Sequence, residues 1–494
     1  MLRLSGRVAL VFALYCGMEA LAQPPLSRIN PAVKQVVDQV SEERIGAIMK
    51  KLESFGTRYV GSEQDSPDHG IGAAQRWIES EFKSYSPKLQ VSLDKFQVKK
   101  SQRLAKDVEL ANIVAILPGT IDKDRYVVIS GHYDSIALRR AAGQAASDNA
   151  GSAADQEPLA PGVADDASGT AAVMELARVM SQYEFDKSII FVTFAAEEVG
   201  LNGSHNYAQE AKEKNMQIEA VLNNDIIGSD MSGDGRSANN RLRVFSEGPE
   251  DSPSRSLARY TKEVAERYMP SMTVDLIFRR DRFGRGGDHT SFNREGFAAI
   301  RLTTPSENYA NQHTATDTFA NASVPYTTRA AKMNAAVLAS LALAPKPPQV
   351  SRPRPAGGQG QGQGQGRAAG APGATPGATP GATPGAGGRR GPGGPGLQRG
   401  TGYDAALRWA MPDAEPDLAG FAVVIRSTTS AYWEREIFVG NVTEYTIPNL
   451  SIDDVVIGVK AIDKDGNQSL VAAYEQAPIQ PAPATPATPA TPRQ

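Results

Sequence analysis

Residues 188–198 read SIIFVTFAAEE, and this short stretch already indicates the fold class. Seven residues in succession, mostly apolar or β-branched, are typical of a strand that is buried on both faces of a sheet. Such strands are common in α/β proteins, where helices cover both faces. Two adjacent carboxylates, Glu197 and Glu198, follow the strand closely. Open α/β sheets collect their functional groups beyond the carboxyl ends of the strands, so this pair stands where a site is expected.

The rest of the first 345 residues alternates between strand and helix patterns. Short apolar runs predict strands, and apolar residues at helical spacing predict amphipathic helices. The alternation predicts an α/β fold, a three-layer α/β/α sandwich with a mostly parallel central sheet. The expected strands are 112–117, 126–130, 188–194, 220–224, 242–245 and 298–302, and the expected helices are 35–52, 71–84, 170–181, 253–268 and 326–343.

Four further metal-binding side chains, His132, Asp165, Asp225 and His313, lie near strand ends or the start of a helix. Each alone has an ordinary explanation, since adjacent acids at a helix start serve as caps. Together with the Glu pair they suit zinc, which binds imidazole nitrogen and carboxylate oxygen. Of two adjacent carboxylates, one can bind metal while the other takes a proton from water. Asp134 is placed to orient the His132 imidazole. The set predicts a two-zinc hydrolase.

The N-terminus has the pattern of a secretory signal. Two arginines precede a short apolar run, 8–16, and an A-x-A site at 20–22, so we expect cleavage before Gln23 and a secreted or periplasmic protein; an uncleaved anchor is the alternative. Cys16, the one cysteine, lies in that segment, so any metal must be held by His and carboxylate. No later segment is long and apolar enough to predict a transmembrane helix.

Two low-complexity segments divide the remainder of the chain. Residues 346–400, rich in Gly, Pro and Gln, predict a disordered linker, and 479–494 form a low-complexity tail. Between them, 401–478 contains short alternating strands separated by turns, which predicts a small all-β sandwich. The formal net charge is −3 and no basic run is present, which argues against a nucleic-acid partner.

Three motifs resemble those of the M28 family of zinc peptidases, in particular the secreted bacterial leucyl aminopeptidases. They are APGVADDASGTAAV, FAAEEVGLNGS and HTATDT, and the resemblance covers about residues 40–345 of the 23–345 segment. It implies a phosphorylase/hydrolase-like fold and two Zn²⁺ per chain. By position, the resemblance implies that Asp165 bridges the two ions. His132 and Asp225 would complete one site, and Glu198 and His313 the other. The resemblance also implies that Glu197 is the general base and that Asp134 is the partner of His132.

Some features depart from that family pattern. The segment between the first two ligands is longer than in the relatives, and we expect a flexible flap beside the cleft. The relatives also have a disulfide and a tyrosine before an Asp-His pair, and the tyrosine helps to stabilise the oxyanion. Here 280–289 reads RDRFGRGGDH, so Asp288 and His289 are present, in a supporting role, without Cys or Tyr. The candidates for the oxyanion role are Arg282, Arg285 and Tyr309.

Residues 401–478 resemble a fibronectin type III domain through Trp409, GFAVVIRS and VKAIDKDG. Such domains usually bind other molecules or hold neighbouring domains apart. The expected partner is a surface, a polysaccharide or a protein. The segment carries no site motif. We therefore expect hydrolysis of small substrates to depend on residues 23–345.

The leading prediction is a secreted dinuclear-zinc aminopeptidase that hydrolyses the N-terminal bond of peptides, with a preference for apolar first residues. Two alternatives keep the fold: a carboxypeptidase or dipeptidase, and a glutaminyl cyclase that uses one zinc. The full six-residue set favours two metals and hydrolysis. A non-catalytic binding protein is a third alternative, which the loss of a ligand would favour; none is lost.

Overall fold

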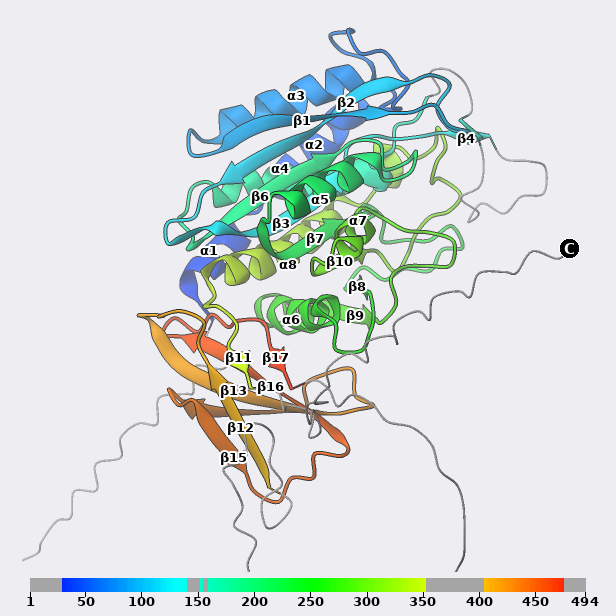
Figure 1. Ribbon diagram of the computed structural model, residues 1–494. Helices are drawn as coiled ribbons and strands as arrows, with labels where there is room; N and C mark the ends of the chain where they lie inside the picture. The colour runs from blue at the N-terminus through cyan, green and yellow to red at the C-terminus, as the bar shows by residue number, and fades with distance from the viewer. Residues whose placement is uncertain (1–28, 140–151, 154–158, 352–403, 475–494) are drawn as a thin grey trace, which may run out of the picture.

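An eight-stranded sheet forms the centre of the larger part of the protein (Figure 1). The computed structural model describes residues 29–139, 152–153, 159–351 and 404–474. The sheet consists of β1 (Gln90–Val98), β2 (Val108–Leu117), β3 (Asp122–His132), β6 (Lys187–Phe194), β7 (Gln217–Asn224), β8 (Arg241–Ser246), β9 (Thr273–Ile277) and β10 (Ala299–Thr303). The short strands β4 (Leu138–Arg139) and β5 (Ser152–Ala153) pair separately.

The strand order of the large sheet is β1-β2-β6-β3-β7-β10-β8-β9. The pairings β3·β6, β3·β7, β7·β10 and β8·β9 are parallel, and the other three are antiparallel. The predicted α/β fold with a mostly parallel central sheet is confirmed. Because β6, β3 and β7 are parallel neighbours, their carboxyl ends meet at one edge of the sheet, which is where the metal-binding side chains were expected.

Helices cover both faces of this sheet. Val192, Phe194 and Phe292 form part of the apolar cluster on one face, and a larger cluster fills the other. The first face carries α5 (Asn202–Glu213) and α7 (His289–Arg294). The second carries α1 (Pro31–Asp38), α2 (Glu42–Glu53), α3 (Gly70–Tyr85), α4 (Ser168–Met180), α6 (Pro253–Tyr268) and α8 (Val324–Leu343). The three expected layers are therefore present.

The prediction of a single helix over residues 35–52 is wrong. Two helices, α1 and α2, occupy this region, and Ser41 stands between them as the N-cap of α2, accepting a hydrogen bond from the Arg44 amide at 3.2 Å. A serine hydroxyl satisfies a free amide at a helix start better than it supports a helix interior, so the chain breaks there. The strands β1 and β9 and the helices α5 and α7 were not predicted; β1 is an edge strand with many exposed positions.

A smaller all-β part, the β unit, contains the strands β11 to β17. One sheet has the order β11-β12-β15 and the other β14-β13-β16-β17. Trp409, Phe421 and Val459 lie in the apolar core of the unit. The strands are β11 (Gln349–Val350), β12 (Ala405–Ala410), β13 (Leu418–Ser427), β14 (Arg435–Gly440), β15 (Glu444–Ile447), β16 (Val455–Asp463) and β17 (Ala472–Ala473). The expected all-β sandwich is thus present as two antiparallel sheets.

Strand β11 falls within the residues expected to form the linker. Val350 pairs with Trp409 of β12, so this sheet receives strands from both sides of the low-complexity segment. The remainder of that segment, residues 352–403, lies outside the described residues. The same holds for the signal segment, the C-terminal tail and most of the expected flap between the first two ligands.

The β unit packs directly against the sheet-bearing part, beneath α6 (Figure 1). Lys460 of β16 is 2% exposed and binds Glu263 of α6 at 2.9 Å and Glu436 of β14 at 2.8 Å. The fully buried Arg426 forms an ion pair with Asp251. Apolar packing continues across the junction, where Leu470 joins the core cluster of the larger part. The β unit is therefore a packed part of the described fold.

We expect Lys460→Met to lower the free energy of unfolding by about 1–3 kcal/mol, because it leaves two half-buried carboxylates without their cation. Thermal or denaturant unfolding measures the change. Lys95→Met is the matched control, since its pair with Glu109 is largely exposed, with side chains 64% and 54% accessible, and should contribute less than about 1 kcal/mol. Equal effects of the two substitutions would show that the ion pairs of Lys460 contribute no more to stability than an exposed pair does.

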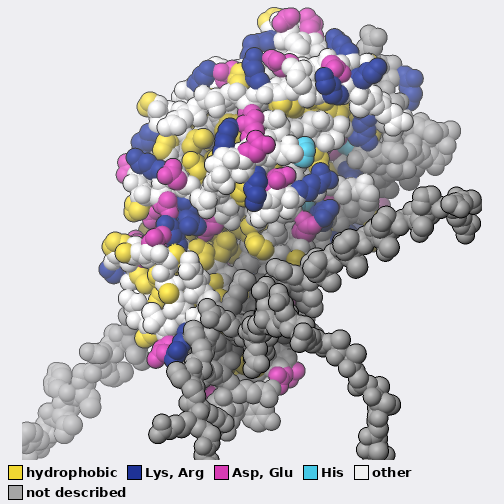
Figure 2. Space-filling model, viewed as in Figure 1, with side chains coloured by type: hydrophobic (Ala, Val, Ile, Leu, Met, Phe, Trp, Pro, Cys, Tyr) yellow, Lys and Arg dark blue, Asp and Glu magenta, His cyan; other side chains and the backbone are white. Residues whose placement is uncertain are grey.

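The surface of the sheet-bearing part carries mixed charge on the face drawn in Figure 2. Lysine and arginine side chains alternate there with aspartate and glutamate, and no patch of one sign covers the face. Within the described residues, every helix is too short or too polar to cross a membrane.

Candidate metal centre

All six predicted site residues gather at the carboxyl edge of the central sheet. His132 is the last residue of β3, the pair Glu197-Glu198 follows β6, and Asp225 follows β7 directly. Asp165 lies in the short helical turn η2 (Val163–Ala167) that leads into α4. His313 lies in the loop after β10 and is 6% exposed. Each ligand is thus supplied by a different element, and the parallel strand order brings them together.

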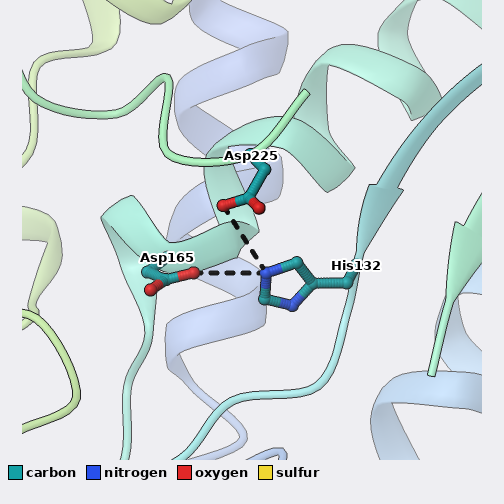
Figure 3. A group of neighbouring side chains, drawn as sticks. All are labelled: His132, Asp165 and Asp225. Atoms are coloured by element: carbon teal, nitrogen blue, oxygen red, sulfur yellow. Dashed lines mark ion pairs between the residues drawn. The ribbon is translucent and has the colours of Figure 1, made fainter. Parts of the chain in front are cut away.

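The first group contains His132, Asp165 and Asp225 (Figure 3). The Nε2 atom of His132 lies 3.2 Å from Oδ1 of Asp165 and 4.0 Å from Oδ1 of Asp225. In Figure 3 both carboxylates point toward the same ring nitrogen. Three donor atoms that converge from three elements make a cage of the size that a metal ion occupies.

The second group contains Asp165, Glu198 and His313. The Nε2 atom of His313 lies 3.1 Å from Oδ2 of Asp165 and 3.1 Å from Oε2 of Glu198. Asp165 therefore belongs to both groups, with one oxygen directed to each histidine. A carboxylate with this orientation can bridge two metal ions.

The donor atoms fit zinc. His132 Nε2 and Glu198 Oε1 are buried and have no hydrogen-bond partner among the described residues. Buried polar atoms nearly always have a partner, so two such atoms at one site call for a ligand. Imidazole nitrogen with carboxylate oxygen is a donor set that zinc accepts.

The electrostatics of the site also call for cations. Burial raises the pKa of Glu197 well above its usual range, and the charges of Asp225 and Glu198 add to the rise. Burial lowers the pKa of His313, but the carboxylates of Glu198 and Asp165 outweigh it and raise that pKa to about 9. Carboxylates this close together need protons or metal ions between them. Bound zinc would supply that positive charge.

Asp134 supports the site in two ways. Its backbone carbonyl oxygen lies 3.1 Å from His132 Nδ1, which leaves Nε2 free to face the metal groups. Its carboxylate accepts hydrogen bonds from the amides of Glu197 and Glu198 at 3.1 and 3.2 Å. Asp134 thus orients the His132 ring mainly through its backbone carbonyl. Its carboxylate instead holds the backbone of Glu197 and Glu198 in place.

Asp166 connects three elements around the site, a role that the sequence did not reveal. Its carboxylate accepts hydrogen bonds from the amides of His132, Gly169 and Ile226 at 3.0–3.1 Å. Asp166 therefore caps the start of α4, as expected for an acid at a helix start. It also connects the ends of β3 and β7 to that helix.

Other supporting residues were missed as well. Gln312 donates to Asp165 Oδ2 at 2.7 Å, and Asp317 accepts from the Asp165 amide at 3.0 Å. The fully buried Arg301 of β10 contacts Asp225 Oδ1 at 3.0 Å. An arginine inside an apolar strand was a signal for such a role, because a buried charge needs a partner.

The three oxyanion candidates have different positions. Arg282 is bound to Asp281 and to Glu307, so its charge is already paired. Arg285 donates to Gln312 at 3.3 Å, one contact away from Asp165. Tyr309 lines a separate cavity. Of the three, Arg285 is the one linked to the metal groups.

Asp288 and His289 stand at the start of α7 and are fully buried. Burial raises the pKa of Asp288 to about 7. His289 Nε2 contacts the Arg280 carbonyl at 2.9 Å. This contact fixes the segment before α7 and agrees with a supporting position.

Comparison with known sequences identifies the family. A sequence profile described as Peptidase family M28 matches residues 112–338, which include all six predicted site residues. A probable zinc metalloprotease of Pyrenophora teres f. teres is 33% identical to this chain, over 92% of this chain and 88% of its own length. The chain belongs to peptidase family M28. A further probable zinc metalloprotease, from Leptosphaeria maculans, is 32% identical over 88% of this chain and 95% of its own length.

The M28 chain is accordingly a zinc-dependent peptidase, a hydrolase. Among solved structures, the LapA aminopeptidase of Legionella pneumophila is similar to it, with 22% sequence identity and a TM-score of 0.47. That similarity covers 63% of this chain and 74% of the LapA chain.

Proposed function

We propose that this M28 peptidase is a dinuclear-zinc aminopeptidase. The observation that carries the proposal is the position of Asp165, whose two carboxylate oxygens face His132 and His313 at 3.2 and 3.1 Å. Two donor groups that share one carboxylate suit two ions at the spacing of about 3.5–4 Å that two-metal hydrolases use. His132 and Asp225 would complete one zinc site, and Glu198 and His313 the other.

Zinc, when bound, would supply Lewis-acid polarisation of the scissile carbonyl and make nearby water more acidic. Glu197 would take the proton from the attacking water and later deliver it to the leaving amine nitrogen. Glu197 is the only one of the six site residues that keeps intermediate solvent exposure, so water can reach it. Asp134 would hold the glutamate in place through the Glu197 amide.

Recognition of the N-terminus would rest on charge and space. Asp225 belongs to one donor group and Glu197 lies beside it, and their negative charges would favour a cationic or metal-associated α-amine over a neutral amide. The motif resemblance to leucyl aminopeptidases supports an apolar first residue. Leucyl peptides are therefore the first substrates to test.

The test compares one leucyl peptide with a free and with an acetylated N-terminus. The free peptide should release leucine, and the acetylated peptide should react at least about 100-fold more slowly, because an interaction with the reacting end is lost. Product analysis by mass spectrometry identifies the released residue. Equal rates, or release of the C-terminal residue first, would favour the carboxypeptidase alternative; cyclisation of an N-terminal glutamine would favour the cyclase.

Two predictions about the rest of the chain remain proposals. The signal pattern supports secretion with Gln23 as the first mature residue. The two-sheet architecture of the β unit supports its assignment as a fibronectin type III-like domain. Its proposed partner is a surface, a polysaccharide or a protein.

A further inference from the structure

A cavity of about 690 Å³ opens beside the metal centre and is not used by the proposed chemistry. Arg241 and Arg243 of β8 and Asp275 of β9 form one wall. The loop 232–238 and the segment 305–310 form the others. Its charged lining residues are Asp234, Arg236, Arg241, Arg243, Asp275 and Glu307.

The cavity lies at the same edge of the sheet as the metal groups. The amide of Asp225 donates to Leu302 of β10 at 3.1 Å, and the next residue of β10, Thr303, pairs with Arg243 of β8. Asp225 and Arg243 are therefore two strands apart at nearly the same level. Adjacent strands lie about 4.8 Å apart, so the two backbones are separated by about 10 Å.

Glu307 connects the two places. It lines this cavity and also a smaller one that Asp165 and Gln312 border. Its charge is taken up by Arg282, through one carboxylate oxygen. Glu307 therefore lies where the larger cavity adjoins the smaller one that borders Asp165.

Arg243 is the unbalanced charge of the cavity. Asp234 is paired with Arg236, Asp275 with Arg241, and Glu307 with Arg282. Arg243 is half-buried, and its guanidinium makes no ion pair or hydrogen bond among the described residues. A guanidinium in this situation suits a carboxylate, which it can bind through two parallel hydrogen bonds.

We propose that this cavity binds a carboxylate of the peptide substrate through Arg243, about three residues from the N-terminus. The inference rests on the proposed aminopeptidase function. An extended peptide rises about 3.3 Å per residue, so a chain that begins at the metal centre reaches Arg243 after about three residues. The carboxylate is either the C-terminus of a tripeptide or an acidic side chain at the third position. The substrates favoured by this site are therefore short or acidic peptides.

The test measures kcat/KM for three peptides: Leu-Ala-Ala, its C-terminal amide, and Leu-Ala-Asp amide. The wild-type enzyme should prefer the free acid to the Leu-Ala-Ala amide by about tenfold or more, as expected for a charge-assisted hydrogen bond. In Arg243→Gln this ratio should fall to near 1. Arg294→Gln is the matched control, because Arg294 is exposed at the end of α7 and borders none of these cavities; it should keep the wild-type ratio.

The three peptides also separate the outcomes. Preference for Leu-Ala-Asp amide over Leu-Ala-Ala amide assigns the site to an acidic side chain, and preference for the free acid alone assigns it to the C-terminus. A wild-type ratio of 1 for both comparisons, or an unchanged ratio in Arg243→Gln, overturns the inference and leaves the proposed function intact. Failure to release leucine from any of the three peptides would instead contradict the aminopeptidase function.

Discussion

Glu197→Gln should lower turnover by about 10²–10⁴-fold while the protein keeps its zinc. The amide cannot take a proton from water, and general-base catalysis contributes about this factor. The substitution preserves the shape of the side chain, and the Glu197 amide still donates to Asp134. Steady-state kinetics on a leucyl peptide and metal analysis of the same sample measure both quantities.

Glu198→Ala is the informative counterpart, since Glu198 is the adjacent carboxylate and faces His313. It should weaken zinc binding, and its activity should recover in part when zinc is added in excess. If Glu197→Gln lost zinc and Glu198→Ala kept it, the assignment of base and ligand would be reversed.

Asp165→Ala should abolish activity, with a loss of about 10³-fold or more. Asp165 is shared by both donor groups, so its removal takes one ligand from each. Lewis-acid stabilisation of the transition state contributes several kcal/mol, and each 1.36 kcal/mol corresponds to a factor of ten in rate. Zinc content and kcat are measured together.

Glu175→Gln is the matched control for that loss. Glu175 is also a fully buried carboxylate, in α4, where it binds the Ser41 amide and Arg178. Its substitution should lower stability without changing the zinc content. Loss of zinc in both variants would mean that general destabilisation, rather than a missing ligand, explains the Asp165 result.

Much of the fold could be predicted from local patterns. All eight residues of β6 are buried, and most of them are apolar or β-branched. Helix α6 has the bounds that were expected, 253–268. Elements with weaker patterns escaped. The edge strand β1 mixes exposed and buried positions, and the serine at 41 divides a helix that periodicity alone would continue.

The site residues were accessible because each follows a recognisable strand or motif. Their supporting contacts were not, since these depend on which strands become neighbours. Arg301 reaches Asp225 only because β10 lies beside β7, an order that no local pattern specifies. Likewise, Arg285 binds Gln312, and Gln312 binds Asp165. The three residues come from separate segments of the chain, so no local pattern predicts these contacts.

Docking of the β unit was also beyond prediction. The low-complexity segment predicted two independent parts. In the structure, however, Lys460 forms an ion pair with Glu263, and Leu470 packs into the apolar core of the sheet-bearing part. Each of these residues is ordinary in its own strand or loop. Complementarity between two surfaces becomes visible only once both are folded.

Zinc titration of the metal-free protein, with leucine release measured at each step, tests the central claim most directly. Asp165 faces both His132 and His313, so the account predicts two tightly bound equivalents per chain and activity that reaches its plateau at the second. A plateau at one equivalent, with no further tight binding, would contradict the bridging role of Asp165 and the dinuclear mechanism.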